Sequence, residues 1–430
     1  MENYDYTNKT MLAPMVRIGT LPMRLLALEY GADLVYTPEI VDKGIVGAER
    51  IVHPDNGTVD YQVRGVSVFK THPSEKSRLV FQIGSANAEL ALQAALTVKQ
   101  DVSTIDLNCG CPKRFSIHGG MGAALMEEPE KLCGILRTLV QGTGLPVTCK
   151  IRIFEDRQKT LDLVKMIEKT GVKALAVHCR YRDERPRDPG HWDRFKEIVE
   201  AVSIPVIANG DVTEYSKIAQ VRELTGVKGV MIARGAQSNV SVFRKEGLVP
   251  HLEIVRQYIR KAMETRNLHS NTKYVLMQIF APDFTKDPHY RPLCDAKTFR
   301  AICQVFGMVE ELDAWEASQK AQGFPYDVDT HPKRTVAPVA AAEEKVAESD
   351  ASFCPPASIS TTTATAKRKI DDVENAQDEK VVETKSAEVV ESETKEETGP
   401  PAAKVAKTTT SDGSSSQPTP ADTPQPVDLE

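Results

Sequence analysis

Two cysteines flank a glycine at the end of a predicted strand, in the segment Asp106-Leu107-Asn108-Cys109-Gly110-Cys111-Pro112. The residues just before the thiols are apolar and β-branched, as is typical of a buried strand in a parallel sheet. Gly110 and Pro112 end that strand, so both thiols are presented at its carboxyl end. Thiols in this position can bind a metal, exchange disulfides, donate a proton or pack against the core.

The other cysteines argue against a metal or a disulfide. Zinc needs two further ligands at suitable spacing, and Cys133 and Cys149 fall in a predicted helix and a predicted strand without a nearby His. A thioredoxin-like role needs C-x-x-C, which the chain lacks. The eight cysteines follow no disulfide-framework spacing, and the N-terminus lacks the basic start and apolar stretch of a signal peptide. We therefore expect free thiols in a reducing compartment and no bound metal.

Short apolar runs alternate with helix-like segments along the first part of the chain, and this alternation predicts the fold. Eight such strands favour an α/β fold of the (β/α)8 TIM-barrel type over an open doubly wound sheet. A flavodoxin-like sheet would need only about five strands, and no G-x-G-x-x-G follows the first strand. No run approaches the roughly 18 apolar residues of a membrane span, so we expect no membrane contact. The predicted strands are residues 10–15, 34–40, 79–84, 103–109, 146–152, 174–179, 205–210 and 229–234.

In such a barrel the chemistry lies where strands end and loops begin. Any single residue there has a simpler explanation, because a lone His is more often structural and a lone Lys is usually solvated. The recurrence of polar side chains at successive strand ends, however, predicts that they form one shared site. The residues at these ends are Met15, Gln82, Asn108, Lys150, His178, Asn209 and Arg234. The last two strands run into Ala-Asn-Gly-Asp-Val and Ala-Arg-Gly-Ala-Gln, which favours a phosphate site over simple tight turns.

Composition divides the 430 residues into three parts. We expect a catalytic barrel over 1–245, a small all-α helical domain over 246–330 and a disordered low-complexity tail over 331–430. From Arg256 to Arg300 there are nine Lys and Arg against four Asp and Glu, which is moderate support for RNA binding and is also compatible with solvated surface. The tail holds 11 Lys and Arg against 19 Asp and Glu, so the net charge of −6 belongs to the tail. Its basic islands at 367–369 and around Lys407 suggest nuclear import, although a solvated cluster in a linker is the simpler interpretation.

Several motifs, in this order, resemble the dihydrouridine synthase family of flavin enzymes. They are LAPMVRIGTLPMR, FQIGSANAELA, DLNCGCPKRFSIHGGMGAAL, VTCKIRI, LAVHCR, IANGD and MIARGA. The sequence is most similar to the eukaryotic members that act on uridine 20 in the D-loop of tRNA, which share TLPMRLLALEYGAD and the NTKY helix. The resemblance covers about residues 10 to 310. Animal members carry a double-stranded RNA-binding domain after the helical domain, and here only the tail follows.

The resemblance implies a cofactor, a substrate and roles for individual residues. It implies bound FMN, reduction by NAD(P)H, a tRNA substrate, a monomer, and a cytoplasmic or nuclear location. Cys111 matches the catalytic cysteine of the family, and Asn108 a residue that contacts the target uracil. The implied cofactor-binding residues are Ala13, Pro14, Met15, Gln82, Lys150, His178, Asn209, Gly210, Asp211, Ala233 and Arg234. The expected substrate-binding residues are Asn108, Lys113, Arg114, Arg152, Lys273 and Arg300.

Reduction of the uracil C5=C6 bond gives the two thiols of the opening segment different roles. Reduced flavin supplies a hydride to C6 on one face, so an acid on the opposite face must protonate C5. Cys111, two residues beyond the strand and fixed by Pro112, fits that acid because a thiol is protonated at neutral pH. Cys109 is expected to pack in the core. Two alternatives stay open: an FMN enzyme acting on a free pyrimidine or dihydroorotate, and an RNA-binding protein with an inactive barrel.

Overall fold

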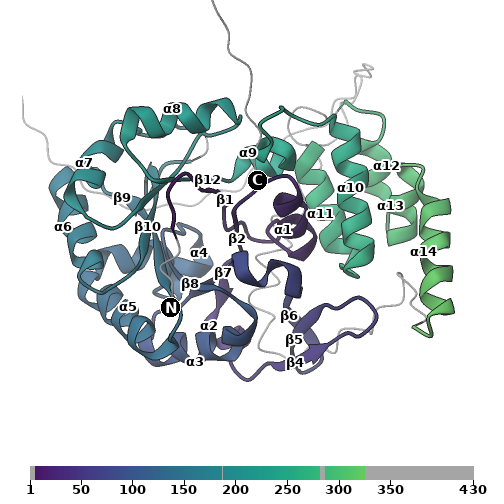
Figure 1. Cartoon of the computed structure of the whole chain (residues 1–430), viewed down its shortest axis with the longest axis horizontal. Coiled ribbons are helices and arrows are strands. Elements are labelled where there is room, and N and C mark those ends of the chain that lie inside the picture. The colour runs from purple at the N-terminus through teal and green to yellow at the C-terminus, as the bar shows by residue number, and fades with distance from the viewer. Residues whose placement is uncertain (1–4, 186, 281–285, 325–430) are drawn as a thin grey trace, which may run out of the picture. The chain divides into compact units, whose positions relative to one another are not determined.

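Eight parallel strands form a closed barrel in the computed structural model, which describes residues 5–185, 187–280 and 286–324 (Figure 1). Neighbouring strands pair in the order β2-β1-β12-β11-β10-β9-β8-β7, and β2 pairs again with β7 to close the sheet. The predicted TIM-barrel fold is therefore confirmed. The strands are β1 (Thr10–Leu12), β2 (Leu34–Tyr36), β7 (Leu79–Gly84), β8 (Thr104–Cys109), β9 (Val147–Ile153), β10 (Ala174–Tyr181), β11 (Val206–Asn209) and β12 (Gly229–Ile232).

Helices follow the barrel strands and cover the outside of the barrel (Figure 1). Side-chain caps begin two of them: Asn87 Oδ1 accepts from Leu90 N at 2.9 Å, and Asp156 Oδ1 accepts from Lys159 N at 3.0 Å. Gly144 and Gly226 end two others in left-handed backbone conformations. The covering helices are α1 (Leu21–Glu29), α3 (Ala88–Val98), α5 (Pro129–Thr143), α6 (Arg157–Glu168), α7 (Arg194–Ala201), α8 (Ser216–Thr225) and α9 (Arg234–Ser238), with the short α4 (Arg114–His118), η2 (Lys99–Asp101), η3 (Gly122–Glu127) and η4 (Val240–Phe243) in loops.

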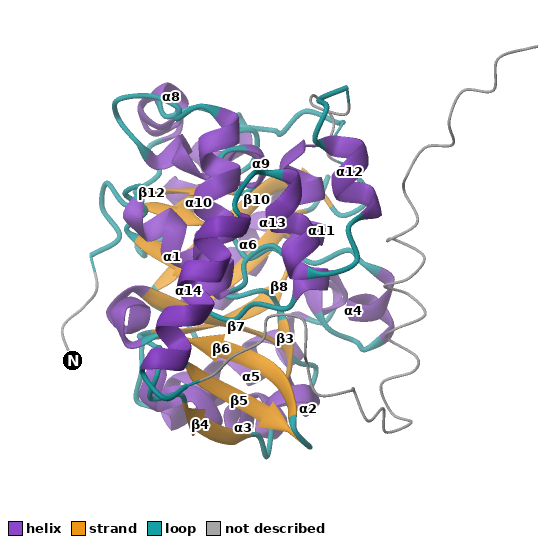
Figure 2. Cartoon of the chain, turned by 90° about the vertical axis from the view of Figure 1, so that its right-hand side faces the viewer, coloured by secondary structure: helices purple, strands orange, loops and turns teal. Residues whose placement is uncertain are grey.

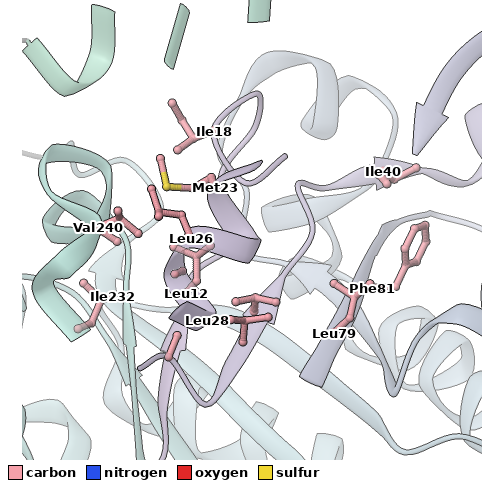
Figure 3. Close-up of a cluster of buried hydrophobic side chains, with 14 of the residues drawn as sticks. Leu12, Ile18, Met23, Leu26, Leu28, Ile40, Leu79, Phe81, Ile232 and Val240 are labelled. Atoms are coloured by element: carbon pink, nitrogen blue, oxygen red, sulfur yellow. The ribbon is translucent and has the colours of Figure 1, made fainter. Parts of the chain in front are cut away.

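Alternation along each strand divides the core into two clusters. One fills the lumen with Met11, Leu34, Val80, Ile207 and Met231 among others. The other lies between the barrel wall and the helices. Figure 3 shows part of it, where side chains of β1, α1, β12 and η4 pack together. Since apolar side chains fill only one end of the lumen, the polar residues of the same strands lie toward the carboxyl end.

The segment between β2 and β7 holds an extra antiparallel sheet that the sequence analysis missed (Figure 2). Apolar residues alternate through Val59–Val63 and Val66–Thr71, and Arg64 and Gly65 between them both have positive φ. That two-residue turn is the signal that could have predicted the hairpin. The elements of this segment are β3 (Ile40–Val41), α2 (Asp42–Ile45), β4 (Glu49–Val52), β5 (Val59–Val63), β6 (Val66–Thr71) and η1 (Pro73–Arg78).

Within the described residues, five helices follow the barrel, in agreement with the expected helical region (Figure 1). They hold the loop after β1, because Asn271 Nδ2 donates to Arg17 O at 2.8 Å and the Arg17 guanidinium lies 3.8 Å from the centre of the Tyr274 ring. The helices are α10 (His251–Glu264), α11 (His269–Phe280), α12 (Tyr290–Asp295), α13 (Phe299–Val305) and α14 (Val309–Ala321). The described residues all belong to one compact unit, 1–357, so the domain boundary near 245 stays a prediction. The tail and its basic islands lie outside the described residues.

A buried ion pair connects α1 to η1, the short helix that follows the extra sheet. Arg24 donates to both carboxylate oxygens of Glu75 at 2.9 and 2.7 Å, and to the carbonyl oxygens of Gly19 and Lys70 at 2.8 Å each. Both side chains are at most 1% exposed. A buried charge is tolerated only when it is paired and fully hydrogen-bonded, and this pair meets that condition.

Replacement of Glu75 by Ala should therefore lower the free energy of unfolding by about 3–5 kcal/mol, since it leaves the Arg24 guanidinium buried without its carboxylate. Glu128→Ala is the control, because it removes the exposed partner of Lys131 and should change stability by less than about 1 kcal/mol. Urea denaturation of the two variants measures both values. Equal stabilities would contradict this role for the Arg24–Glu75 pair.

Candidate active site

A pocket of about 140 Å³ lies at the carboxyl ends of the strands β9 to β12. The barrel brings these residues together from four consecutive strand ends that are far apart in sequence. Most of the predicted cofactor residues of the second half of the barrel line this pocket. The lining residues are Arg152, His178, Arg180, Asn209, Gly210, Asp211, Val212, Thr213, Met231, Ala233 and Arg234.

Two glycines allow close backbone approach at the pocket: Gly210 faces β10, and Gly235 faces the loop after β11. A Cβ on Gly210, whose φ is +134°, would lie 2.5 Å from the Cys179 sulfur. A Cβ on Gly235 would lie 3.0 Å from both Val212 O and Thr213 Cα, which are backbone atoms that cannot move aside. Larger residues at these two positions would therefore push the loops away from their neighbours and change the pocket that the loops line.

The charges in the pocket are predominantly positive. Asp211 accepts from Arg180 Nη2 at 2.5 Å, pairs also with Arg234, and accepts from Gly190 N at 2.7 Å. Burial alone would raise the pKa of Asp211, but the hydrogen bonds from Arg180 and Gly190 and the two guanidinium charges lower it. One carboxylate thus faces three guanidinium groups, including that of Arg152. The excess of positive charge suits an anionic group such as a phosphate.

His178 is an uncharged hydrogen-bonding group in this pocket. Burial lowers its pKa far below the ordinary value, and the nearby cations Lys150, Arg152 and Arg180 lower it further. Arg180 Nη1 lies 3.1 Å from His178 Nε2. Since a guanidinium can only donate, Nε2 is the acceptor and the imidazole proton is on Nδ1. His178 therefore offers a neutral N–H donor, and we infer this tautomer from the Arg180 contact.

Lys150 comes from the inward face of β9 and is half-buried. Burial lowers the pKa of its ammonium group to about 8, and the Arg152 charge contributes in the same direction, while Asp106 opposes the shift. The side chain is consequently a cation at neutral pH that loses its proton just above it. Neighbouring strands place Asn108 beside Lys150 in the pairing of β8 with β9.

A chain of polar side chains crosses the lumen beneath Lys150. Gln82 Nε2 donates to Asp106 Oδ2 at 2.8 Å, Thr148 Oγ1 donates to Asp106 Oδ1 at 2.7 Å, and Asn108 Nδ2 donates to Gln82 Oε1 at 3.2 Å. Burial raises the pKa of Asp106 to about 6 despite these hydrogen bonds. The sequence analysis missed Asp106, although its position two residues before Asn108 on a strand placed it on the same inward face.

The loop that carries Cys111 is held from several sides. Asn108 Oδ1 accepts from the backbone N–H groups of Gly110 and Cys111 at 3.0 Å each, and Arg152 Nε donates to Gly110 O at 3.1 Å. Ala123 N donates to Cys111 O at 3.0 Å. The side-chain carbonyl of Asn108 thus accepts two backbone N–H groups, and its amide group donates one hydrogen bond to Gln82. One amide N–H of Asn108 is left for the predicted contact with uracil.

The two thiols of the Cys-Gly-Cys segment lie in different environments. Cys109 is completely buried, with its sulfur 3.6 Å from that of Cys149, so the expectation that it packs in the core is confirmed. Cys111 is half-buried at the barrel mouth. Burial and, to a smaller extent, the nearby Glu39 carboxyl together raise the pKa of the Cys111 thiol to about 12. Cys111 is therefore a protonated thiol over the whole physiological range.

The first half of the predicted cofactor set lies at the same end of the barrel but is not among the residues that line the pocket. Gln82 belongs to the lumen chain, and the residues after β1 form a loop in which Met15 O accepts from Gly19 N at 2.9 Å. Ala13 is buried, whereas Pro14 and Met15 are half-buried. A role for Ala13, Pro14, Met15 and Gln82 in cofactor binding stays a prediction.

The predicted substrate-binding residues have diverse surroundings. Lys113 and Arg114 are exposed beside the Cys111 loop. Arg152 is buried and donates to Tyr181 O at 2.7 Å as well as to Gly110. Lys273 Nζ donates to Cys294 O at 2.5 Å and Ala296 O at 2.9 Å, and Arg300 pairs with Asp313 and Glu316 at 2.6 and 2.7 Å. Lys273 and Arg300 therefore have intramolecular roles, and their contact with RNA stays a prediction.

Comparison with known proteins gives the family. The family model described as dihydrouridine synthase (Dus) matches residues 11–320. The chain belongs to the dihydrouridine synthase family. It is 45% identical over 316 residues to a tRNA-dihydrouridine(20) synthase [NAD(P)+] of Schizosaccharomyces pombe, a match that covers 70% of this chain and 65% of the relative. It is 42% identical over 298 residues to a Saccharomyces cerevisiae protein of the same name, covering 64% of this chain and 77% of that protein.

The described residues of this family member contain neither a candidate metal cluster nor a candidate membrane-spanning helix. Among the described residues, no group of three or more His, Cys, Asp or Glu is arranged to hold a metal ion. Within the same part of the chain, no helix combines the length and the apolar character that crossing a bilayer requires.

The lowered pKa of Lys150 can be tested in this Dus family member without any ligand. In competitive acylation across a pH series, Lys150 should titrate near pH 8, well below an ordinary lysine. Arg152→Gln should move this midpoint upward, because it removes a neighbouring positive charge. Mass spectrometry of the Lys150 peptide measures both midpoints, with the exposed Lys43 as the internal reference. A Lys150 midpoint equal to that of Lys43 would contradict the described environment.

Proposed function

We propose that this protein reduces a uridine of tRNA, at position 20 in the D-loop, to 5,6-dihydrouridine with electrons from NAD(P)H. The protonated Cys111 thiol at the mouth of a barrel whose pocket suits a phosphate-bearing cofactor is the observation that carries the proposal. Membership of the dihydrouridine synthase family supports it, as does the similarity to two proteins named tRNA-dihydrouridine(20) synthase. An enzyme for free pyrimidines is the alternative that the experiment below distinguishes.

The residues of the pocket fit FMN as the cofactor. The backbone around Gly210 and Gly235 and the guanidinium groups of Arg180 and Arg234 suit its phosphate, because small residues and positive charge converge there. His178 offers a neutral N–H and Lys150 a positive charge at the inner end of the same site. When bound, FMN supplies the hydride that reduces C6 of the uracil ring. Asn108 is left with one N–H to orient that ring.

Cys111 performs the other half of the reduction. Its thiol donates a proton to C5 of the uracil, and the raised pKa means that the proton is present whenever a substrate arrives. The target base must leave the folded D-loop to reach this thiol, since the site lies at the end of a closed barrel. Lys113 and Arg114 are exposed beside the loop and suit the phosphates around an extruded base.

Location, oligomeric state and domain division remain part of the proposal. We propose a monomer that acts in the cytoplasm, the nucleus or both, as the sequence analysis expects. The catalytic barrel over 1–245 and a helical domain over 246–330 that contributes to tRNA binding complete the proposed organisation.

The function is tested by incubating the purified protein with NADPH and either unmodified tRNA or free uracil. Dihydrouridine should form in the tRNA, and mapping should place it at position 20. Cys111→Ala should leave the reduction of bound flavin by NADPH intact while tRNA reduction falls by roughly 10²–10⁴-fold, the usual contribution of a positioned general acid. Cys109→Ala is the matched control, because that thiol is fully buried in the core.

Two outcomes would contradict the proposal. Reduction of free uracil without reduction of tRNA would support the alternative enzyme. Turnover of tRNA by Cys111→Ala at the rate of the unaltered protein would assign the acid role to another group.

FMN binding gives a separate prediction. Gly210→Ala should release the flavin, because a Cβ there meets the Cys179 sulfur and the φ of +134° is strained for any other residue. Gly44→Ala is the control, since its Cβ would contact nothing within 4 Å. The absorbance of the bound flavin in each purified variant is the measurement. Full flavin content in Gly210→Ala would place the cofactor elsewhere.

A further inference from the structure

Glu39 lies beside Cys111 although it is distant in sequence. It belongs to the turn between β2 and β3, at the same barrel end as the Cys111 loop. Ser116 Oγ of α4 donates to Glu39 Oε1 at 3.1 Å. A Cβ on Gly122 would collide with Ser116 Oγ and lie 3.1 Å from Cys111 Cβ, so the hydroxyl and the thiol side chain converge on one point. A Cβ on Gly84 would likewise lie 2.5 Å from Glu39 Oε1.

One oxygen of this carboxyl group has no partner. Glu39 Oε2 is buried, and nothing within the described residues donates a hydrogen bond to it. A buried carboxylate oxygen without a donor is costly, so its presence at the mouth of the site calls for a functional explanation. Glu184, in the loop after β10, differs from Glu39 because both of its carboxylate oxygens have partners. Tyr181 N donates to Oε2, and His191 Nε2 lies within hydrogen-bonding distance of Oε1.

We propose that Glu39 is a positioning residue that keeps Cys111 protonated and returns its proton after each turnover. The inference rests on the proposed function, in which Cys111 is the acid. It assigns to this chain a second group in proton delivery that acts only through the thiol.

The electrostatics of the pair agree with this geometry. Burial raises the pKa of Glu39, while the Cys111 thiol, Ser116 and the Lys113 charge lower it. The Glu39 carboxyl in turn raises the pKa of Cys111. The other charged groups that interact with the thiol are Lys150 and Arg152 of β9. Burial and, after it, the negative charge of Glu39 therefore keep the Cys111 thiol protonated although Lys113, Lys150 and Arg152 lie nearby.

The proton transfer balances without any redox partner. Cys111 gives its proton to C5 and becomes a thiolate, whose negative charge raises the proton affinity of the adjacent Glu39 carboxylate. Glu39 takes a proton from solvent at the mouth and donates it to the Cys111 sulfur, which restores both groups. The Glu39 side chain is half-buried at the mouth, so it can exchange a proton with solvent.

The first test needs no substrate. Alkylation of Cys111 by iodoacetamide, followed by mass spectrometry of its peptide, reports the thiolate fraction. Glu39→Gln keeps the shape of the side chain but removes its charge, so the alkylation rate near neutral pH should rise by about tenfold. Asp42→Asn is the matched control, because this buried carboxylate close by in sequence accepts from Ser85 at 2.6 Å and should leave the rate unchanged.

The second test separates the first turnover from later ones. With flavin already reduced, Glu39→Gln should reduce one equivalent of tRNA at close to the normal rate, because Cys111 still carries a proton. Steady-state turnover should fall by about tenfold or more, since the thiolate is reprotonated slowly. A purely structural role would slow both phases equally and leave the alkylation rate unaltered.

An unchanged alkylation rate in Glu39→Gln, with flavin content confirming the fold, would overturn the inference. Equal losses in first and later turnovers would overturn it as well. Failure of the proposed function is distinguishable, because the unaltered protein would then reduce no tRNA while the alkylation result would still report on the pair.

Discussion

Val35 and Tyr36 of β2 pair with Leu79 and Val80 of β7, and this pairing leaves the eight-stranded sheet without a free edge. In a closed barrel every second residue of each strand must point into one narrow lumen. Apolar residues fill the lower part of that lumen, so the polar residues further along the same strands meet at the carboxyl end. The site is a consequence of barrel closure, because closure brings residues that are far apart in sequence, such as Gln82 of β7 and Asn209 of β11, to the same end of one lumen.

Burial then determines which groups at the mouth are charged. The same loss of water raises the pKa of the acids Cys111 and Asp106 and lowers the pKa of the bases Lys150 and His178. At neutral pH these shifts leave the Cys111 thiol protonated and the His178 imidazole uncharged, whereas Lys150 is still a cation. Asp211 is the exception, because it accepts hydrogen bonds from Arg180 and Gly190 that stabilise its negative charge.

The helices after the barrel also stabilise loops of the barrel domain. Asn271 and Tyr274 of α11 hold the loop after β1, and Lys70 of the extra sheet donates to Thr265 O and Arg266 O at the corner between α10 and α11. Several basic residues of this region are engaged in the same way, since Arg260 pairs with Glu311 and Lys261 with Glu29. A count of basic residues therefore overestimates the positive charge that this region offers to a binding partner.

The sequence by itself determined the strand–helix alternation, the barrel and the residues at the strand ends, because local periodicity and chain breaks are written in consecutive residues. Leu79–Gly84 was predicted with its observed limits, and Cys109 was correctly separated from Cys111 by the alternation of a strand. Contacts between segments that are distant in sequence could not be predicted, since no local sequence pattern indicates them. The partners of Lys273 and Arg300, the tautomer of His178 and the meeting of Glu39 with Cys111 were decided only by the tertiary structure, where closure of the barrel and docking of the helices bring those side chains together.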